Sequence, residues 1–468
     1  MKKFLLLLGW LWVLSAQSQT FPVNNLTVAG TALFSGQATF STFPFGPTAT
    51  IGDSSTKLAT TAFVASGFAG LASPGFSGIP TAPTAALGTN SIQLATTAFV
   101  AAHDPCINIL DFGGNNSAGT NNDTALNSAL AAASSVLDAC VYFPPGQYNF
   151  GANVTYTFPN RFSAVTIRGA GQETTQLIWA GGGGLTLNMD GTYTSFHVQD
   201  MTIVSGTSGS GVGLTLLQQA GAQTAPGNQA MSDVTRVAFR GSDGYAATKY
   251  WNTDISMSGV SQINFIGDNF YGPSPAAGIG VSLNGTAAAV ATVENFTDCI
   301  FNQLSSGIVY GTDVQGVSVS QSNFTGDVNG ISVPGGEVNL DQLVFIGNQV
   351  EATSAGISAA SYVPDALISG NLFIVPANAL AVQLVPSGLF TIYGNSIHGL
   401  STSNTNGFVI GSSNFGGVIT GNSIYNILTG IFLQSTSSHV NVQSNFYNGV
   451  TTPVQNSGTS NTVGGGSN

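Results

Sequence analysis

Apolar and polar residues alternate in short runs through most of the chain, and these runs recur about every 24 residues. Short alternating runs bounded by Gly and Asn predict strands joined by turns. A period of this length predicts the coils of a β-solenoid, which stack about 4.8 Å apart. Successive coils are separated by 25, 23, 24, 27 and 23 residues, and Cys299 continues the spacing toward the N-terminus. The period is marked by an asparagine close to an apolar residue at Asn323, Asn348, Asn371, Asn395, Asn422 and Asn445.

The recurring asparagines predict a hydrogen-bonded ladder inside one turn of the solenoid. A stacked side-chain amide can donate to one coil and accept from the next, which satisfies buried polar groups. We favour this structural interpretation over a row of ligand-binding amides. Apolar residues in the same register are interpreted as core rather than as a binding platform. They are Phe301, Phe324, Phe373, Ile397 and Ile424.

The segment before the repeats predicts how the solenoid begins. A strand-like run at 106–112 precedes Asn121-Asn122-Asp123, which are residues typical of a helix N-terminus, and apolar residues at helical spacing follow. Further strand-like runs lie at 140–150 and 165–179. This succession resembles the beginning of the pectate-lyase-like right-handed parallel β-helix superfamily, in which the helix caps the first coil. We therefore expect residues 105–468 to form an all-β, right-handed single-stranded parallel β-helix (β-solenoid) with an N-terminal capping helix.

The N-terminus predicts export. Lys2 and Lys3 precede an apolar run from Phe4 to Leu14, and small residues follow up to Ser18. The run is too short to cross a bilayer, which needs roughly 20 residues. We interpret residues 1–18 as a secretory signal peptide, with an uncleaved hydrophobic anchor as the alternative. No membrane insertion is expected after removal of the signal.

Residues 19–104 contain an internal repeat and are expected to form a stem. PTATIGDSSTKLATTAFVA at 47–65 matches PTAALGTNSIQLATTAFVA at 83–101, and the alternation at 26–40 predicts small strands before them. None of these units has enough apolar surface for a core, so they need neighbouring repeats or other chains. The repeat resembles those of bacteriophage tail fibres and tailspikes, where the region attaches to the virion. The resemblance implies a homotrimer, virion attachment through this stem, and a location in a virion tail or outside the cell.

Charge is scarce and unevenly distributed. The 468 residues include 8 Lys and Arg and 20 Asp and Glu, or 6% charged residues, where an ordinary soluble domain has roughly 25%. No Lys or Arg follows Lys249. This composition argues against binding to nucleic-acid phosphates and against a polybasic membrane-surface role. A neutral surface rich in hydroxyl and amide groups instead suits sugars.

The three cysteines leave two interpretations open. Cys106 and Cys140 each begin a strand-like run, and export would allow a disulfide between them if the strands are neighbours. The alternative is that these two and Cys299 are buried thiols that pack as small hydrophobic side chains. No Cys or His spacing indicates a zinc site.

The solenoid register suggests one catalytic pair of carboxylates. Asp268 precedes Asn269 and Asp298 precedes Cys299, which are the apparent ladder positions of successive coils. Carboxyl groups about 5 Å apart suit a retaining glycosidase, and their proximity drives their pKa values apart. Glu294 is a substitute partner. The alternative is that these are solvated turn residues without a catalytic role.

The segment 236–251 interrupts the period and is expected to be an insertion loop, where binding residues tend to occur. Arg236 and Arg240 can hold the carboxylate of an acidic sugar. Tyr250 and Trp251 offer aromatic faces on which sugar rings stack. The alternative is that these side chains pack a lid.

Two classes of function follow. β-Helices of the resembled superfamily mostly act on polysaccharides as hydrolases or lyases, which implies recognition and depolymerisation of a bacterial surface or extracellular polysaccharide. The alternative is a non-catalytic glycan-binding fibre or adhesin, because the chain lacks the Asp-Asp, Gly-His-Gly and Arg-x-Lys motifs of polygalacturonases. No cofactor is expected, apart from Ca²⁺ if the reaction is that of a lyase. His197, His398 and His439 are isolated in the sequence and are interpreted as structural.

Overall fold

The chain divides into two units, residues 1–96 and 97–468. The computed structural model describes short segments between 27 and 97 and residues 106–464 except 134–137, 152, 158–163, 190–193, 219–229, 387 and 413–415. The predicted signal peptide, residues 1–18, lies outside the described residues. No helix in the described part of the chain is long and apolar enough to cross a membrane.

The two repeats of the first unit share a local hydrogen bond. Thr60 Oγ1 donates to Thr48 Oγ1 at 3.2 Å, and their counterparts Thr84 and Thr96 are joined at 3.0 Å. In the first repeat the helix α2 (Thr61–Gly67) follows directly. The described residues of 26–40 lie in no strand, which differs from the expectation for that segment. The function of residues 19–104 as a stem stays a prediction.

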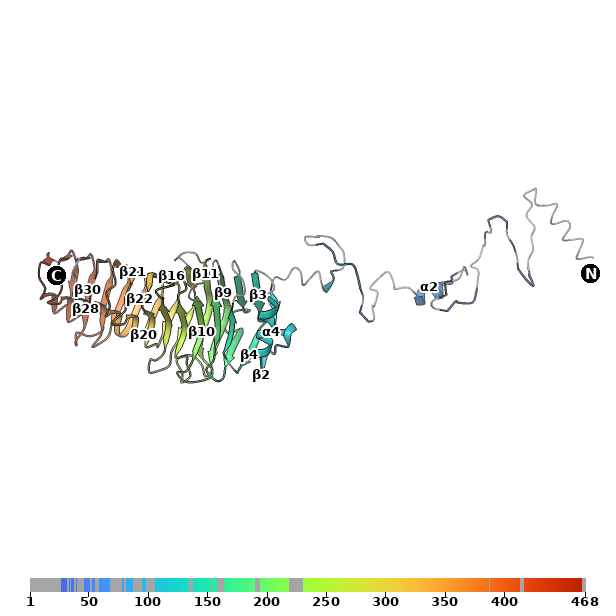
Figure 1. The fold of residues 1–468 in the computed structure, drawn as a ribbon, viewed down its shortest axis with the longest axis horizontal. Coiled ribbons are helices and arrows are strands. Elements are labelled where there is room, and N and C mark those ends of the chain that lie inside the picture. The colour runs from blue at the N-terminus through green and yellow to red at the C-terminus, as the bar shows by residue number, and fades with distance from the viewer. Residues whose placement is uncertain are drawn as a thin grey trace, which may run out of the picture. The chain divides into compact units, whose positions relative to one another are not determined.

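The predicted capping helix is present near the start of the second unit. β1 (Ile107–Asn108), the short 3₁₀ helix η2 (Ile109–Phe112) and β2 (Ser117–Asn121) lead into α4 (Asp123–Ala133). Figure 1 shows α4 at the end of the β-helix where the coils begin. Because an open first coil would expose its core to water, the apolar side of the helix covers it. The residues buried on that side are Ala125, Leu126, Ala129, Leu130 and Ala133.

Strands of successive coils pair in parallel, which confirms the predicted right-handed parallel β-helix. The strands form three faces, here called face 1, face 2 and face 3. Face 1 contains β1, β3 (Asp138–Tyr142), β6 (Ala164–Arg168), the first halves of β9 (Ser195–Ser205) and β11 (Ser232–Gly241), β13 (Ile263–Ile266), β16 (Ala291–Thr297), β19 (Val314–Ser320), β21 (Asp341–Ile346), β23 (Ala366–Ser369), β26 (Phe390–Tyr393), β29 (Gly417–Thr420), β32 (Val440–Gln443) and β35 (Thr462–Val463).

Face 2 follows face 1 within each coil, after the turn that carries the asparagines. It contains β2, β4 (Gly146–Phe150), β7 (Thr175–Trp179), the second halves of β9 and β11, β14 (Asn269–Tyr271), β17 (Ile300–Asn302), the first parts of β20 (Asn323–Val333) and β22 (Gln349–Ala359), β24 (Leu372–Val375), β27 (Ser396–Gly399), β30 (Ser423–Tyr425) and β33 (Phe446–Asn448).

Face 3 completes each coil. It contains β5 (Val154–Thr157), β8 (Leu185–Met189), β10 (Val212–Gln218), β12 (Thr253–Ser258), β15 (Ile279–Asn284), β18 (Ser306–Tyr310), the last parts of β20 and β22, β25 (Leu380–Leu384), β28 (Asn406–Ile410), β31 (Thr429–Leu433) and β34 (Thr452–Asn456).

Side chains stacked from coil to coil fill the interior. The rings of Phe270, Phe301 and Phe324 are stacked with centroids 4.8 and 4.6 Å apart, and all three are fully buried. On face 3, Gly307 leaves room for these rings, since a Cβ there would lie 2.8 Å from ring carbons of Phe324. The predicted core assignment is confirmed for Phe301, Phe324, Phe373, Ile397 and Ile424.

The predicted asparagine ladder is present between faces 1 and 2. Nδ2 of Asn371, Asn395 and Asn422 each donates to Oδ1 of the next ladder asparagine at 2.9 Å. The same Oδ1 atoms accept the backbone N–H of the preceding ladder residue, as from Asn371 to Asn395 at 3.0 Å. These side chains are almost fully buried, so the ladder satisfies amides that would otherwise be costly to bury.

The ladder register differs by one residue from the prediction at Asn323. Ser322 occupies the ladder position, because its N–H donates to Asn348 Oδ1 at 2.9 Å, and Asn323 instead begins β20 opposite Gln349. Cys299 continues the ladder, with its N–H donating to Ser322 Oγ at 3.1 Å. Two adjacent polar residues, Ser322 and Asn323, made the register ambiguous in the sequence.

The structure decides between the two interpretations of the cysteines. β1 and β3 are neighbours, with Ile107 opposite Val141, and a disulfide joins Cys106 to Cys140. Cys299 is a buried free thiol.

Candidate functional site

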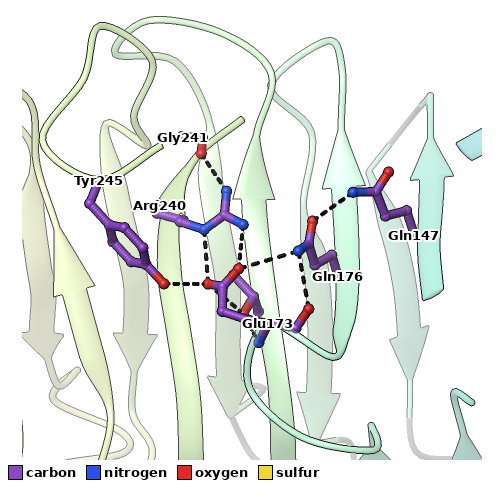
Figure 2. Close-up of polar contacts among 7 residues, drawn as sticks. Gln147, Glu173, Gln176, Arg240, Gly241 and Tyr245 are labelled. Atoms are coloured by element: carbon purple, nitrogen blue, oxygen red, sulfur yellow. Dashed lines mark hydrogen bonds and ion pairs between the residues drawn. The ribbon is translucent and has the colours of Figure 1, made fainter. Parts of the chain in front are cut away.

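Figure 2 shows a polar cluster on the outer side of face 2, built around Glu173, Arg240 and Tyr245. Glu173 lies in the turn before β7, Arg240 in β11, and Tyr245 in the turn after β11. Arg240 Nε donates to Glu173 Oε1 at 2.9 Å, and Arg240 Nη2 donates to Oε2 at 2.6 Å. The Tyr245 hydroxyl donates to the same Oε1 at 2.6 Å. One carboxylate therefore joins the turn before β7 to β11 and its following turn, which lie 67 and 72 residues farther along the chain.

Strand alternation directs Arg240 toward this carboxylate. Successive side chains of a strand point to opposite sides, so the buried Phe239 faces the core and Arg240 faces outward. The strand register places Arg240 opposite Val204, which lies opposite Ile178 of β7. A further hydrogen bond from Arg240 Nη1 to the Gly241 carbonyl, at 2.8 Å, fixes the guanidinium plane. Two parallel charge-assisted bonds then hold the carboxylate in one orientation.

The cluster is electrically neutral as a whole at neutral pH. Hydrogen bonds from Arg240 hold the pKa of Glu173 below its ordinary value, although partial burial opposes this. Burial, together with the neighbouring Glu173 carboxylate, raises the pKa of Tyr245 to about 12. Glu173 is therefore ionised and paired with a cation, and Tyr245 keeps its proton as a hydrogen-bond donor.

Amide and aromatic side chains extend the cluster in both directions along face 2. Gln176 Nε2 donates to Glu173 Oε2 at 3.2 Å, and Gln147 Nε2 donates to Gln176 Oε1 at 3.1 Å (Figure 2). On the other side, the ring of Tyr245 packs edge-to-face against the ring of Tyr271, with the two ring centroids 4.6 Å apart. Tyr245 is 50% exposed. We call this set, Gln147, Gln176, Glu173, Arg240, Tyr245 and Tyr271, the face 2 strip.

Asp268 lies inside the β-helix rather than in a surface groove. It is fully buried, and its Oδ1 accepts a hydrogen bond from the Val237 N–H at 2.8 Å. Because Asn269 pairs with Ile300, Asp268 occupies the ladder position and corresponds to Cys299, not to Asp298. Burial raises the pKa of Asp268 well above its ordinary value, because it penalises the charged form of the carboxyl group. The predicted equivalence of Asp268 and Asp298 is wrong.

Asp298 and Glu294 also differ from expectation. Asp298 is exposed and has a φ of +56°. It lies in the tight turn directly before the ladder residue Cys299, and the equivalent residue of the preceding coil is Gly267. Glu294 faces the core between Ile263 and Val317 and is fully buried. Burial raises the pKa of Glu294 well above its ordinary value. The three predicted catalytic carboxyl groups are therefore not brought together in one groove, and their catalytic role stays a prediction that the geometry does not favour.

The predicted insertion loop begins later than expected, because residues 236–241 are the end of β11 and only the residues after Gly241 form a loop. Arg236 and Arg240 both lie in β11, and the loop proper follows Gly241. Arg236 is exposed and forms a bidentate ion pair with Asp200, with Nε–Oδ1 and Nη2–Oδ2 distances of 2.6 and 3.0 Å. Of the predicted substrate-binding residues, Arg240 belongs to the face 2 strip.

The two aromatic residues at the end of that segment have different surroundings. Trp251 is 1% exposed and its Nε1 donates to the Ile203 carbonyl at 3.2 Å, so its expected place in a substrate groove is wrong. Its ring packs edge-on against Trp179, which places it in the core. Tyr250 is half-buried, and its backbone forms an isolated parallel β-bridge with Ser208.

Sequence reasoning missed Glu173 and the two glutamines of the strip. Glu173 and Arg240 are 67 residues apart, and the coils between them have irregular lengths, so no fixed period connects them. The usable signal was charge itself, because each is a rare charged residue in an almost uncharged chain. Among the described residues, no three His, Cys, Asp or Glu side chains are grouped as a metal site requires. The need for Ca²⁺ in a lyase reaction stays a prediction.

Comparison with known families agrees with this architecture. Residues 106–357 match the family described as rhamnogalacturonase A/epimerase, pectate lyase-like. The chain belongs to this family. The matched region contains the capping helix, the face 2 strip and the beginning of the asparagine ladder. No curated protein matches the chain.

Several solved structures with low sequence identity are similar to this chain, and the first of them has a TM-score above 0.5. The mannuronan C-5 epimerase AlgE6 A-module of Azotobacter vinelandii is 17% identical, with a TM-score of 0.55 over 77% of this chain and 98% of that one. Tailspike protein 3 of bacteriophage CBA120 is 16% identical, with a TM-score of 0.48 over 79% of this chain and 62% of that one. PfbA, a surface adhesin of Streptococcus pneumoniae, is 12% identical, with a TM-score of 0.46 over 75% and 92%.

Proposed function

We propose that the protein recognises a bacterial surface or extracellular polysaccharide on the outer side of face 2 and depolymerises it. The observation that carries the proposal is the face 2 strip, in which Glu173, Arg240 and Tyr245 are joined to two outward-facing glutamines (Figure 2). Amides both donate and accept hydrogen bonds, as the hydroxyl groups of sugars require. The exposed ring of Tyr245 beside Tyr271 supplies an apolar surface with a polar edge, which suits the face of a sugar ring.

The electrostatics of the strip favour a neutral or weakly charged glycan. Arg240 is 10% exposed and already paired with Glu173, so its charge is not free for a strongly anionic ligand. The chain as a whole has a formal net charge of −12, which opposes binding to nucleic acid. The polymer contacts would therefore be hydrogen bonds and ring stacking rather than multiple ion pairs.

Depolymerisation is the second part of the proposal. Membership of a rhamnogalacturonase A/epimerase family supports activity on a polysaccharide. Glu173 is ionised at neutral pH, which suits a base or nucleophile, whereas a general acid needs a raised pKa. We therefore propose Glu173 as the reactive carboxylate and the Tyr245 hydroxyl as the adjacent proton donor.

A non-catalytic receptor-binding fibre or adhesin is the alternative, and one observation favours it. Both oxygens of Glu173 already accept hydrogen bonds from Arg240, and Tyr245 and Gln176 also donate to this carboxylate. A carboxylate held in this way is well suited to fix the shape of a binding surface. Binding without cleavage would support this alternative.

The assembly and location complete the proposal. The stem-like repeats support a homotrimer that is secreted or attached to a virion tail, because such repeats bury their apolar positions against other chains. Light scattering of the full chain measures the mass of the particle. A monomer at micromolar concentration would contradict the homotrimer.

The experiment that tests the function measures binding and cleavage together. Purified protein is incubated with polysaccharides from candidate bacterial hosts, and binding, new reducing ends and unsaturated sugar ends are measured. Tyr245→Ala should weaken binding about tenfold or more, since it removes the exposed ring. Tyr393→Ala is the matched control, because Tyr393 is 45% exposed on β26 of face 1 and should leave binding unchanged. Equal affinity for both variants would refute the face 2 strip as the binding surface.

A further inference from the structure

We propose that Ser195, His197 and Asp233 form a separate hydrolytic site that cleaves carboxylic esters, with O-acyl groups on sugars as the substrate class. The three side chains lie on the outer side of face 1, whereas the proposed glycan-binding strip lies on face 2. This activity goes beyond glycan recognition and is measured without a glycan.

The strand geometry brings the three side chains into line. Ser195 and His197 are two residues apart on β9, so both point outward while Phe196 points into the core. Asp233 of β11 lies directly opposite His197 in the parallel pairing. Ser195 Oγ is 3.2 Å from His197 Nε2, and Asp233 Oδ1 accepts a hydrogen bond from His197 Nδ1.

The hydrogen bonds select the tautomer that a serine nucleophile requires. A carboxylate at Nδ1 keeps the proton on that nitrogen and leaves the Nε2 lone pair directed at the Ser195 hydroxyl. Asp233 is itself held by Gln199 Nε2 and by Thr235 Oγ1, which both donate to Oδ2 at 2.9 Å. Its orientation is therefore fixed by three partners.

The charge state agrees with this arrangement. Burial opposes ionisation of Asp233, but hydrogen bonds from His197, Gln199 and Thr235 outweigh it and hold its pKa below the ordinary value. An ionised carboxylate stabilises the imidazolium that forms when histidine takes a proton from serine. The His197 and Asp233 side chains are 27% and 20% exposed, and Ser195 is 6% exposed, so the group lies at the surface of face 1.

The reaction balances without a cofactor. Ser195 Oγ forms a bond to the ester carbonyl carbon while its proton passes to His197 Nε2. The bond between the acyl carbon and the sugar oxygen then breaks, and the imidazolium gives its proton to that oxygen. Water next attacks the acyl-serine, again with His197 as base, which releases the carboxylic acid and restores the hydroxyl group.

The neighbouring coils supply a polar surface for the alcohol part of the ester. Asn264 and Asn295 continue the row of His197 and Asp233 along face 1, and Asn295 Nδ2 donates to Asn264 Oδ1 at 3.1 Å. Amides in register with the reactive group can bind the hydroxyl groups of a sugar. This is the observation that points to acylated sugars rather than to lipid esters, whose alcohol or acyl part needs an apolar surface.

The test uses the full chain with p-nitrophenyl acetate and with an active-site-directed fluorophosphonate. The wild-type protein should hydrolyse the ester and should be labelled on Ser195, as mass spectrometry of its peptides shows. Ser195→Ala and His197→Ala should each lower kcat by about 10²–10⁴-fold. Ser318→Ala is the control, because Ser318 also faces outward on face 1, in register with Asn295 and distant from His197 in the row. It should retain the wild-type rate and labelling.

A second readout separates catalysis from a structural role. Asp233→Asn should lower kcat with little change in KM, since the amide no longer stabilises the imidazolium. Absence of hydrolysis and of Ser195 labelling in the wild-type protein, or a wild-type rate in Ser195→Ala, overturns the proposal. Glycan binding by Ser195→Ala, measured separately, shows whether the function proposed for face 2 holds.

Discussion

Asp268 and Cys299 occupy the same ladder position in successive coils, because Asn269 pairs with Ile300. Farther along, this position holds asparagines that donate as well as accept, as when Asn371 Nδ2 donates to the Phe345 carbonyl at 2.8 Å. Asp268 accepts a hydrogen bond through Oδ1, but its Oδ2 has no partner among the residues that the structure describes. The aspartate is thus an imperfect member of the ladder.

Asp268→Asn should therefore stabilise the β-helix at neutral pH by about 1–2 kcal/mol, because an amide remains uncharged and supplies a donor. The free energy of unfolding in urea at pH 7 measures the effect. Asp298→Asn, at an exposed turn, should change stability by less than about 0.5 kcal/mol. A more stable Asp268→Asn variant that has lost polysaccharide cleavage would instead show that Asp268 is catalytic.

Stability should decrease as the pH rises above about 4, the pKa of these carboxyl groups in the unfolded chain. Burial raises the pKa values of four carboxyl groups well above their ordinary values. These groups are Asp254, Asp268, Glu294 and Asp327. In such a group the folded state binds the proton more tightly than the unfolded state. Its contribution is fully present below the unfolded pKa of about 4 and is lost as the pH rises through the folded pKa. Thermal unfolding at several pH values tests this, and a midpoint that increases toward alkaline pH would contradict it.

Replacing Glu294 with leucine should stabilise the core by about 1–3 kcal/mol. Glu294 is fully buried between Ile263 and Val317, and neither carboxyl oxygen has a hydrogen-bond partner in the described part of the chain. Leucine has a similar size and removes the cost of an unsatisfied polar group. Glu351→Leu, on the outer side of β22, is the control and should have little effect. Destabilisation by Glu294→Leu would indicate that the carboxyl group has a partner.

Asn395→Ala should destabilise the β-helix by about 2–4 kcal/mol, since it removes several buried hydrogen bonds at once. The side chain accepts from the N–H and Nδ2 of Asn371, and it donates to Asn422 Oδ1 and to the Ile368 carbonyl. Denaturant unfolding gives the value. Asn404→Ala, at an exposed turn, is the matched control, and equal losses for both variants would show that the ladder adds nothing to stability.

Arg240→Gln should destabilise the protein more than Arg236→Gln. Both arginines form bidentate pairs from β11, but the Arg240 side chain is 10% exposed and that of Arg236 is 59% exposed. Because Glu173 is 41% exposed, water screens its ion pair with Arg240. We therefore expect Arg240→Gln to lower the free energy of unfolding by about 1–3 kcal/mol and Arg236→Gln by less than about 1 kcal/mol. Thermal unfolding compares the two. Arg240→Gln should also weaken polysaccharide binding, and unchanged binding would separate the ion pair from recognition.

The period of the chain could be predicted from the sequence because each coil buries the same kinds of groups at equivalent positions. Every turn between faces 1 and 2 must satisfy buried backbone groups, and asparagine solves this at Asn348, Asn371, Asn395 and Asn422. The capping helix was readable for a similar reason, since α4 has one apolar side at helical spacing. Both signals are local and recur within short distances of sequence.

The polar sites were not readable in this way. Asp268 and Asp298 look alike in the sequence, yet a shift of one residue turns one side chain into the core and leaves the other in solvent. Glu173 and Arg240 meet across two coils of unequal length, and His197 looks isolated until β11 places Asp233 opposite it.

The sequence by itself determined the parallel β-helix, its capping helix and its ladder, because periodic burial requires a periodic pattern of residues. The tertiary structure alone decided which charged side chains meet, which carboxyl groups are buried in the core and which side chains reach the surface. The physical reason is that the packing of the whole interior sets the coil length and the strand register. A shift of one residue in the register moves a side chain from the core to the solvent.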